Sequence, residues 1–118
     1  MFTLIPVIKP VEYMNKNERI IERHDIHLFC VKTNPDELQP LPRSSLPLKK
    51  EKVYLLVNQA LRKIFLWVGL AAPARSRFVG VHSANIIQRE IGITYRVENV
   101  DQKSKSTDFL QTLAIFEA

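Results

Sequence analysis

The densest group of residues that could bind a metal is His24-Asp25-Ile26-His27, which places two imidazoles and a carboxylate within four positions. Such side chains are common ligands of zinc and other transition metals. Alternation of side chains along an extended strand, however, sends His24 and His27 to opposite faces. We therefore expect a surface feature here and no metal site.

Other residues that could support catalysis or nucleotide binding are sparse. The single cysteine, Cys30, lies in an apolar run without an obvious histidine partner, so we expect a buried thiol and not a nucleophile. Three glycines, at positions 69, 80 and 92, cannot build a phosphate-binding loop, and neither GxxxxGK nor GxGxxG occurs. The acidic residues form no close pair suited to general acid and base catalysis. We expect a protein that is not an enzyme and binds no cofactor.

Positive charge is concentrated in the middle of the chain. The net charge is +5, but the stretch from position 43 to 77 has eight cationic residues against Glu51 alone, a charge of +7. This stretch defines a candidate basic patch: Lys49, Lys50, Lys52, Arg62, Lys63, Arg75 and Arg77. Two interpretations remain open, a binding surface for an acidic partner such as acidic phospholipid, and a solvated face on turns and strand ends. We expect no nucleic-acid binding, because the aromatic residues are not interleaved with these cations.

The length and composition are typical of one globular domain. The chain has 118 residues, of which 46% are hydrophobic and 25% charged, enough to form a single core. No window reaches the ~18 to 20 apolar residues of a membrane-spanning helix, and the apolar start lacks the basic region and cleavage site of a signal peptide. One cysteine fits a reducing compartment. We expect a cytoplasmic protein, a monomer or weak dimer, with an extended N-terminal arm over 1–24 and a single domain over 25–118.

Apolar runs and alternating patterns predict a sheet. Residues 53–57 and 63–68 are continuous apolar runs, which predict central strands covered on both faces. Pro40 cannot donate a backbone hydrogen bond, so the strand over 37–41 belongs at an edge or a bulge. Further strands are predicted over 26–31 and, with alternating exposure, over 93–100.

A long helix is predicted over 74–91, with Pro73 at its start and Gly92 as the left-handed residue after its end. At 100° per residue, one broad face of this helix should lie in the core: Val79, Gly80, Ser83, Ala84, Ile86, Ile87 and Ile91. The opposite face is formed by Phe78, Val81, His82, Asn85 and Arg89. A Phe and a Val on the outer side of a well-patterned helix predict an interaction surface. The alternative is that the N-terminal arm covers them.

A short helix is predicted at the end of the chain. Thr107 is placed to cap it, and its apolar residues should pack on the sheet. These residues are Phe109, Leu110, Leu113 and Phe116.

Several of these segments, taken in order, resemble a gelsolin-like domain over about residues 26–113. The segments are Leu28-Phe29-Cys30-Val31-Lys32, Glu37-Leu38-Gln39-Pro40-Leu41-Pro42 leading to Ser44-Ser45-Leu46, Val53-Tyr54-Leu55-Leu56-Val57 and, most specifically, Ile64-Phe65-Leu66-Trp67-Val68-Gly69 followed by the helix. The resemblance implies an α+β fold in which a five-stranded central mixed sheet is sandwiched between one long and one short helix. That fold is related to the fold of actin-depolymerising factor and cofilin.

The resemblance also implies a function. Actin-binding members place the long helix in a hydrophobic cleft of actin, which makes Phe78, Val81, His82, Asn85 and Arg89 the expected binding residues for actin or an actin-like protein. A single domain is expected to modulate filament dynamics without severing. The alternative, since other members do not bind actin, is a structural or interaction module in a small-GTPase or membrane-trafficking complex, or one that self-associates.

Calcium regulation is where the chain departs from the family pattern. Calcium-regulated members have a Gly-Asp pair before the central strand and a Glu early in the long helix, and these positions correspond here to Glu51-Lys52 and Ser76. Calcium requires oxygen ligands, and a lysine ammonium opposes the ion's charge. We expect no calcium site and calcium-independent binding.

Overall fold

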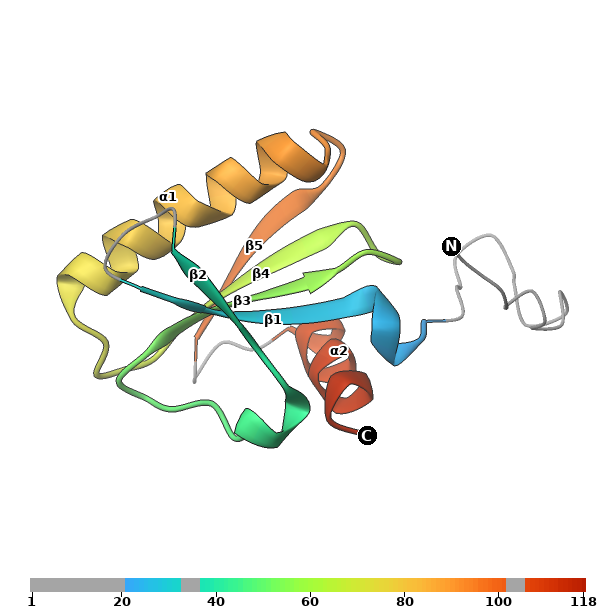
Figure 1. Cartoon of the computed structure of the whole chain (residues 1–118), viewed down its shortest axis with the longest axis horizontal. Helices are drawn as coiled ribbons and strands as arrows, with labels where there is room; N and C mark the ends of the chain where they lie inside the picture. Colours follow the sequence, from blue (N-terminus) through green and yellow to red (C-terminus); the bar gives the residue numbers. More distant parts are fainter. Residues whose placement is uncertain (1–20, 33–36, 102–105) are drawn as a thin grey trace, which may run out of the picture.

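A computed structural model describes residues 21–32, 37–101 and 106–118 of the chain (Figure 1). The predicted N-terminal arm over 1–24 lies outside the described residues up to position 20. The elements are η3 (Arg23–Asp25), β1 (Ile26–Val31), β2 (Leu38–Leu41), η4 (Arg43–Ser45), β3 (Val53–Asn58), β4 (Lys63–Val68), α1 (Ala74–Ile91), β5 (Arg96–Asp101) and α2 (Thr107–Glu117).

The strands form one mixed sheet in the order β2-β1-β3-β4-β5. Neighbours pair antiparallel except β4 and β5, which are parallel because the long helix α1 connects them. Pro40 lies in the edge strand β2, as predicted from its missing donor. Figure 1 shows α1 on one side of the sheet and α2 on the other. The predicted α+β sandwich is confirmed.

Each face of the sheet carries its own core. Side chains alternate along β3 and β4, so successive residues enter opposite layers. The layer beneath α1 contains Val31, Val53, Leu55, Val57, Ile64, Leu66, Ala72, Val79 and Ala84. The layer beneath α2 contains Ile26, Leu28, Cys30, Tyr54, Leu56, Phe65, Trp67, Val100, Phe109 and Phe116. Because both layers are apolar, the central strands appear in the sequence as unbroken apolar runs.

The segment before α1 is held against the loop that leads into β3. Gly69 donates its backbone N–H to the Lys52 carbonyl at 3.0 Å, and Ala71 donates to the Lys50 carbonyl at 2.9 Å. A Cβ at position 69 would lie 2.1 Å from the Lys50 carbonyl oxygen. The glycine that ends Trp67-Val68-Gly69 is therefore required by this close backbone approach.

Helix α1 has the predicted bounds, but its last turn is less buried than its pattern indicates. Val79, Gly80, Ser83 and Ala84 are buried, whereas Ile91 is exposed. Gly92 follows with a φ of +143°, and the Tyr95 N–H donates to the Gly92 carbonyl. Because of this turn, residues 93–95 do not pair with β4, and β5 begins at Arg96, three residues later than predicted.

Helix α2 also differs in detail from its prediction. Its N-cap is Ser106, whose hydroxyl accepts a hydrogen bond from the Phe109 N–H at 3.1 Å, and not Thr107. Phe109 and Phe116 pack in the core as predicted, but Leu110 is exposed. Leu113 is half-buried against the same core, and Thr112, which the apolar pattern did not include, is buried.

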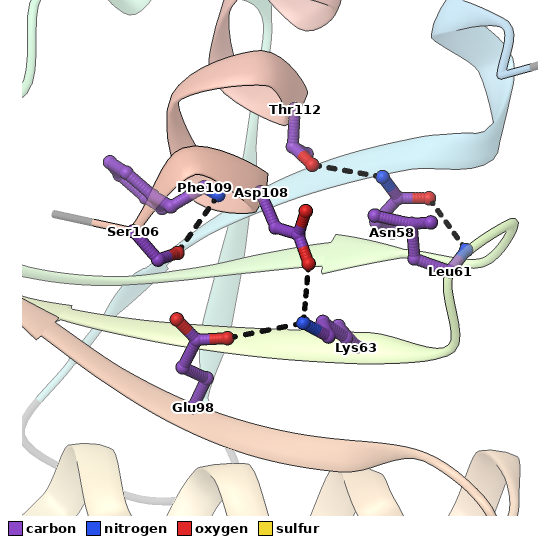
Figure 2. Close-up of polar contacts among 8 residues, drawn as sticks. All are labelled: Asn58, Leu61, Lys63, Glu98, Ser106, Asp108, Phe109 and Thr112. Carbon is purple, nitrogen blue, oxygen red and sulfur yellow. Dashed lines mark hydrogen bonds and ion pairs between the residues drawn. The ribbon is translucent and has the colours of Figure 1, made fainter. Parts of the chain in front are cut away.

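Two polar contacts attach α2 to the sheet (Figure 2). The Asn58 amide donates to the Thr112 hydroxyl at 2.9 Å, while its oxygen accepts from backbone N–H groups of the β3–β4 turn. Lys63 Nζ lies 2.5 Å from an Asp108 oxygen and 3.4 Å from a Glu98 oxygen. Lys63 thus links β4, β5 and α2.

We expect Gly69→Ala to destabilise the domain by about 1 to 3 kcal/mol, the usual cost of forcing a group into packed structure. The added methyl group collides with the backbone of residue 50, which cannot rotate away as a side chain could. Urea unfolding followed by circular dichroism measures this free energy. Ala71→Ser, an exposed change in the same segment, should stay within about 0.5 kcal/mol of the wild type. Equal stability of Gly69→Ala and wild type would contradict the close approach.

The Lys63 cluster predicts a pH dependence at the alkaline end. The hydrogen bond to Asp108 raises the pKa of Lys63 above 10.5, against the opposing effect of burial, and Glu98 adds to the rise. Because the pKa of Lys63 is higher in the folded than in the unfolded chain, its ammonium group adds to the free energy of unfolding. That contribution is complete below pH 10.5 and is lost as the pH rises through the pKa of Lys63 in the folded protein. The difference in unfolding free energy between wild type and Lys63→Met should therefore narrow above pH 10.5. A difference that stays constant across that range would contradict the link.

Candidate functional site

The outer face of α1 exposes apolar side chains that the fold does not use. Phe78 is 75% exposed and Val81 is 48% exposed. The other residues predicted for this face, His82, Asn85 and Arg89, are exposed as well. Burying an exposed phenylalanine and valine in a partner would be favourable by about 1.5 to 3 kcal/mol for each side chain that becomes fully buried. This face is the candidate functional site.

The sheet fixes the direction in which this face points. Val79 and Gly80 pack on β3 and β4 from the opposite side of the helix, and a Cβ at Gly80 would lie 2.8 Å from a Val53 methyl group. Because residues one turn apart share a face, the burial of positions 79, 80, 83 and 84 orients positions 78, 81, 82, 85 and 89 outward. The predicted outward orientation is thus observed.

The basic patch predicted from the sequence is not one surface. Lys52 precedes β3, where Val53 pairs with Val68, whereas Lys63 pairs with Asn58 at the other end of the same two strands. Six residues of strand separate these ends, roughly 20 Å at 3.4 Å per residue. Arg62 and Lys63 therefore lie far from the other members, and Lys63 is already engaged by Asp108 and Glu98.

The remaining basic residues gather where α1 begins. The loop containing Lys49, Lys50 and Lys52 is hydrogen-bonded to residues 69 and 71, just ahead of Arg75 and Arg77. All five side chains are exposed. We call this group the basic end, and it continues directly into Phe78 on the next turn of the helix. Sequence reasoning listed these cations and the helix face separately and did not place them together.

The positions that resemblance relates to calcium binding do lie together. Glu51, Lys52 and Ser76 line one cavity of about 710 Å³ between the β1–β2 edge and the start of α1. Lys32 and Glu37 line it too, so its charged groups are of both signs. Among the described residues, no group of three or more His, Cys, Asp or Glu side chains is arranged to hold a metal ion.

The residues considered for metal binding or catalysis, His24, His27 and Cys30, do not form one site. His24 lies 3.5 Å from a Glu22 oxygen and 3.7 Å from an Asp25 oxygen, in an exposed turn before β1. His27 is exposed on β1, while Cys30 is buried beneath the α2 side of the sheet.

Among the described residues, no helix is long and apolar enough to cross a membrane.

Two exposed apolar residues near the ends of α1 were not predicted as part of a surface. Leu70 follows Gly69 ahead of the helix, and Ile93, which is 84% exposed, follows Gly92 beyond it. The exposure of Leu70 and Ile93 could have been predicted from the glycine that precedes each of them, because a glycine often ends a regular element and leaves the next residue in a turn. Periodicity alone assigned Ile93 to a strand.

The chain is similar to known proteins in its structure. No protein-family model matches the sequence, and no curated protein is significantly similar to it. The chain is similar in structure to Thorarchaeota ProGel, crystallised in a complex with rabbit actin, with a TM-score of 0.66 and 22% identity. That match covers 75% of this chain and 98% of ProGel.

Two further solved structures share the architecture. Thorarchaeota 2DGel3, also crystallised with rabbit actin, is 27% identical with a TM-score of 0.61, and the match covers 81% of this chain and 49% of that one. The human COPII-coat protein Sec24c is 17% identical with a TM-score of 0.53, over 80% of this chain and 16% of Sec24c. The chain thus spans about half of 2DGel3 and a small part of Sec24c.

Proposed function

Because this chain folds as a gelsolin-like domain, we propose that it binds actin or an actin-like protein through the outer face of α1 and modulates filament dynamics. The observation that carries the proposal is the exposure of Phe78 and Val81 on a helix whose other side buries Val79, Gly80, Ser83 and Ala84 against the sheet. The two Thorarchaeota structures with this fold were crystallised with actin, which supports the choice of partner.

The shape of the surface supports binding in a groove. A helix on the outside of a sheet is a convex ridge, and an amphipathic ridge is recognised by an apolar cleft that takes side chains one turn apart. Phe78 and Val81 are such a pair, with His82, Asn85 and Arg89 around them. A partner cleft that receives both apolar side chains would bury them and satisfy the polar ones at its rim.

Calcium independence is part of the proposal. The cavity at Glu51, Lys52 and Ser76 is lined by two carboxylates, those of Glu51 and Glu37, and by two ammonium groups, those of Lys52 and Lys32. Calcium is bound by six to eight oxygen ligands, usually including several carboxylates, and this donor set does not fit that requirement. The electrostatic repulsion from Lys52 therefore supports binding that requires no calcium.

We further propose a cytoplasmic, non-catalytic role as a monomer or weak dimer, with an N-terminal arm over 1–24 preceding the domain. The dispersed positions of His24, His27 and Cys30 support a binding role over catalysis. Acidic phospholipid is an alternative ligand for the basic residues. The vesicle experiment described below distinguishes it from an acidic protein partner.

A second candidate function is supported by the structural similarity to the human COPII-coat protein Sec24c. In this alternative the domain is a structural or interaction module of a small-GTPase or membrane-trafficking complex, or it self-associates. The same exposed helix face would serve it, so actin binding itself must decide between the candidates.

The double variant Phe78→Asp, Val81→Asp should weaken actin binding about 30-fold or more. Loss of a central apolar anchor commonly costs about 2 kcal/mol or more, and an unpaired carboxylate in an apolar cleft adds to the cost. Affinity for actin monomers and the rate of filament assembly measure the effect.

Leu110→Asp is the matched control for this experiment. Leu110 has the same 48% exposure as Val81 but lies on α2, on the opposite side of the sheet. It should leave actin binding unchanged. A wild-type protein that is folded yet leaves actin kinetics unaltered would exclude the actin proposal and favour the second candidate.

Titration calorimetry should detect no stoichiometric binding of calcium to the wild-type domain. A calcium chelator should not change the affinity of the domain for actin. As a positive control, Lys52→Asp combined with Ser76→Glu places two more carboxylates in the same cavity and should increase calcium affinity. Stoichiometric micromolar binding by the wild type would show that calcium independence is wrong.

A further inference from the structure

We infer that the partner presents an apolar cleft bordered by carboxylates, with its strongest negative charge against the basic end of the domain. This inference rests on the proposed function, because it describes the chemistry of the surface that receives α1. It adds two properties, a direction for the helix in the cleft and an association rate that depends on salt.

The first observation is the charge of the helix face itself. Arg75, Arg77 and Arg89 are exposed along α1, and the first turn contains no acidic residue. At 100° per residue, Arg89 and Arg75 lie about 20° and 60° around the axis from Phe78. Arg77 lies farther round, at about 100° on one side, and Glu90, the one acidic residue of this helix, at about 120° on the other. The outer face therefore combines an apolar centre with cationic neighbours and has no carboxylate of its own.

The second observation is that this charge is asymmetric along the helix. The basic end adds Lys49, Lys50 and Lys52 to Arg75 and Arg77, all exposed. Three acidic residues are described at the same end, Glu51, Asp101 and Glu37, and Lys32 is a sixth cation there. The net charge of the described residues at this end is therefore +3. The N-terminus of α1, which carries the positive end of the helix dipole and has no side-chain cap, strengthens the field.

The opposite end of the sheet lacks this excess. Arg62 and Arg96 are exposed there, but Lys63 is paired with Asp108 and Glu98. The Arg96 N–H donates to the Arg62 carbonyl, which places these two arginines side by side. They offer a charge-matched control at a distance from Phe78.

Charge complementarity selects the partner's chemistry. An isolated basic surface would fit many polyanions, but here the basic end continues into two exposed apolar side chains on a convex helix. A protein cleft with an apolar floor and an acidic rim satisfies both features on one convex ridge. An anionic bilayer can also receive basic and apolar side chains, and the vesicle experiment below distinguishes it from the cleft. Steering of this kind can raise association rates by about 10- to 1000-fold, and the gain falls steeply with ionic strength.

The test compares association with monomeric actin by stopped-flow fluorescence across a range of salt concentrations. Arg75→Glu combined with Arg77→Glu should slow association about tenfold or more at low salt and flatten its salt dependence. Arg75→Lys combined with Arg77→Lys should retain most of the wild-type rate, because steering depends on charge and not on guanidinium geometry. Circular dichroism and thermal unfolding verify that each variant is folded.

Arg62→Asp combined with Arg96→Glu is the control pair and should change the rate less than about twofold, since it reverses the same number of charges at the end of the sheet opposite the basic end. Aspartate is chosen at position 62 because that residue has a φ of +56°, which Asp tolerates better than most residues. Equal slowing by both pairs, or a wild-type rate independent of salt, would overturn the inference while leaving the actin proposal intact. Absence of any actin binding by the folded wild type would remove both.

Co-sedimentation with phosphatidylserine vesicles tests whether the basic end binds a lipid surface instead. Co-sedimentation at physiological salt that is lost in Arg75→Glu, Arg77→Glu, together with unchanged actin association of that variant, would assign the basic end to a lipid surface and overturn the inference. Absence of co-sedimentation, together with slowed actin association, would support the acidic protein cleft.

Discussion

Every side chain of the central strands β3 and β4 is buried except those at the two ends of β4, Lys63 and Val68, which are half-buried. The rest of the domain follows from covering these strands. Two apolar faces require two covering layers, which α1 and α2 provide on opposite sides. The chain reaches the second layer only after the crossover through α1, which makes β4 and β5 parallel and the sheet mixed. The exposed helix surface is thus a product of the same constraint that builds the core.

Features governed by hydrophobic periodicity could be predicted from the sequence. The bounds of α1, the edge position of β2 and the central place of β3 and β4 follow from where apolar residues, prolines and glycines fall. Features set by local polar contacts could not. The cap at Ser106 and the turn after Gly92 each depend on one hydrogen bond, and neighbouring residues offered equally plausible patterns. Thr112 enters the core because Asn58 supplies a buried partner from a distant strand.

The candidate site was predictable in its parts and not in its assembly. Helical periodicity is local, so the outward orientation of Phe78 and Val81 could be derived without any tertiary structure. The grouping of cations could not, because the β3–β4 hairpin carries Arg62 to the far end of the sheet while backbone hydrogen bonds bring Lys50 and Lys52 to the start of α1. Proximity along the chain was misleading where the chain reverses direction.

The close seat of α1 at Gly80 has a mechanical consequence. With no side chain at that position, the helix backbone rests directly on Val53 and Leu66, which leaves little room for it to rock or slide. The outer face is then a preorganised ridge, and a partner that binds it need not spend much of its interaction energy on ordering the helix. The outer residues can also be exchanged with little effect on the core, because they are exposed and the core residues lie on the other side of the helix. A small domain of this design can change its partner while keeping its fold.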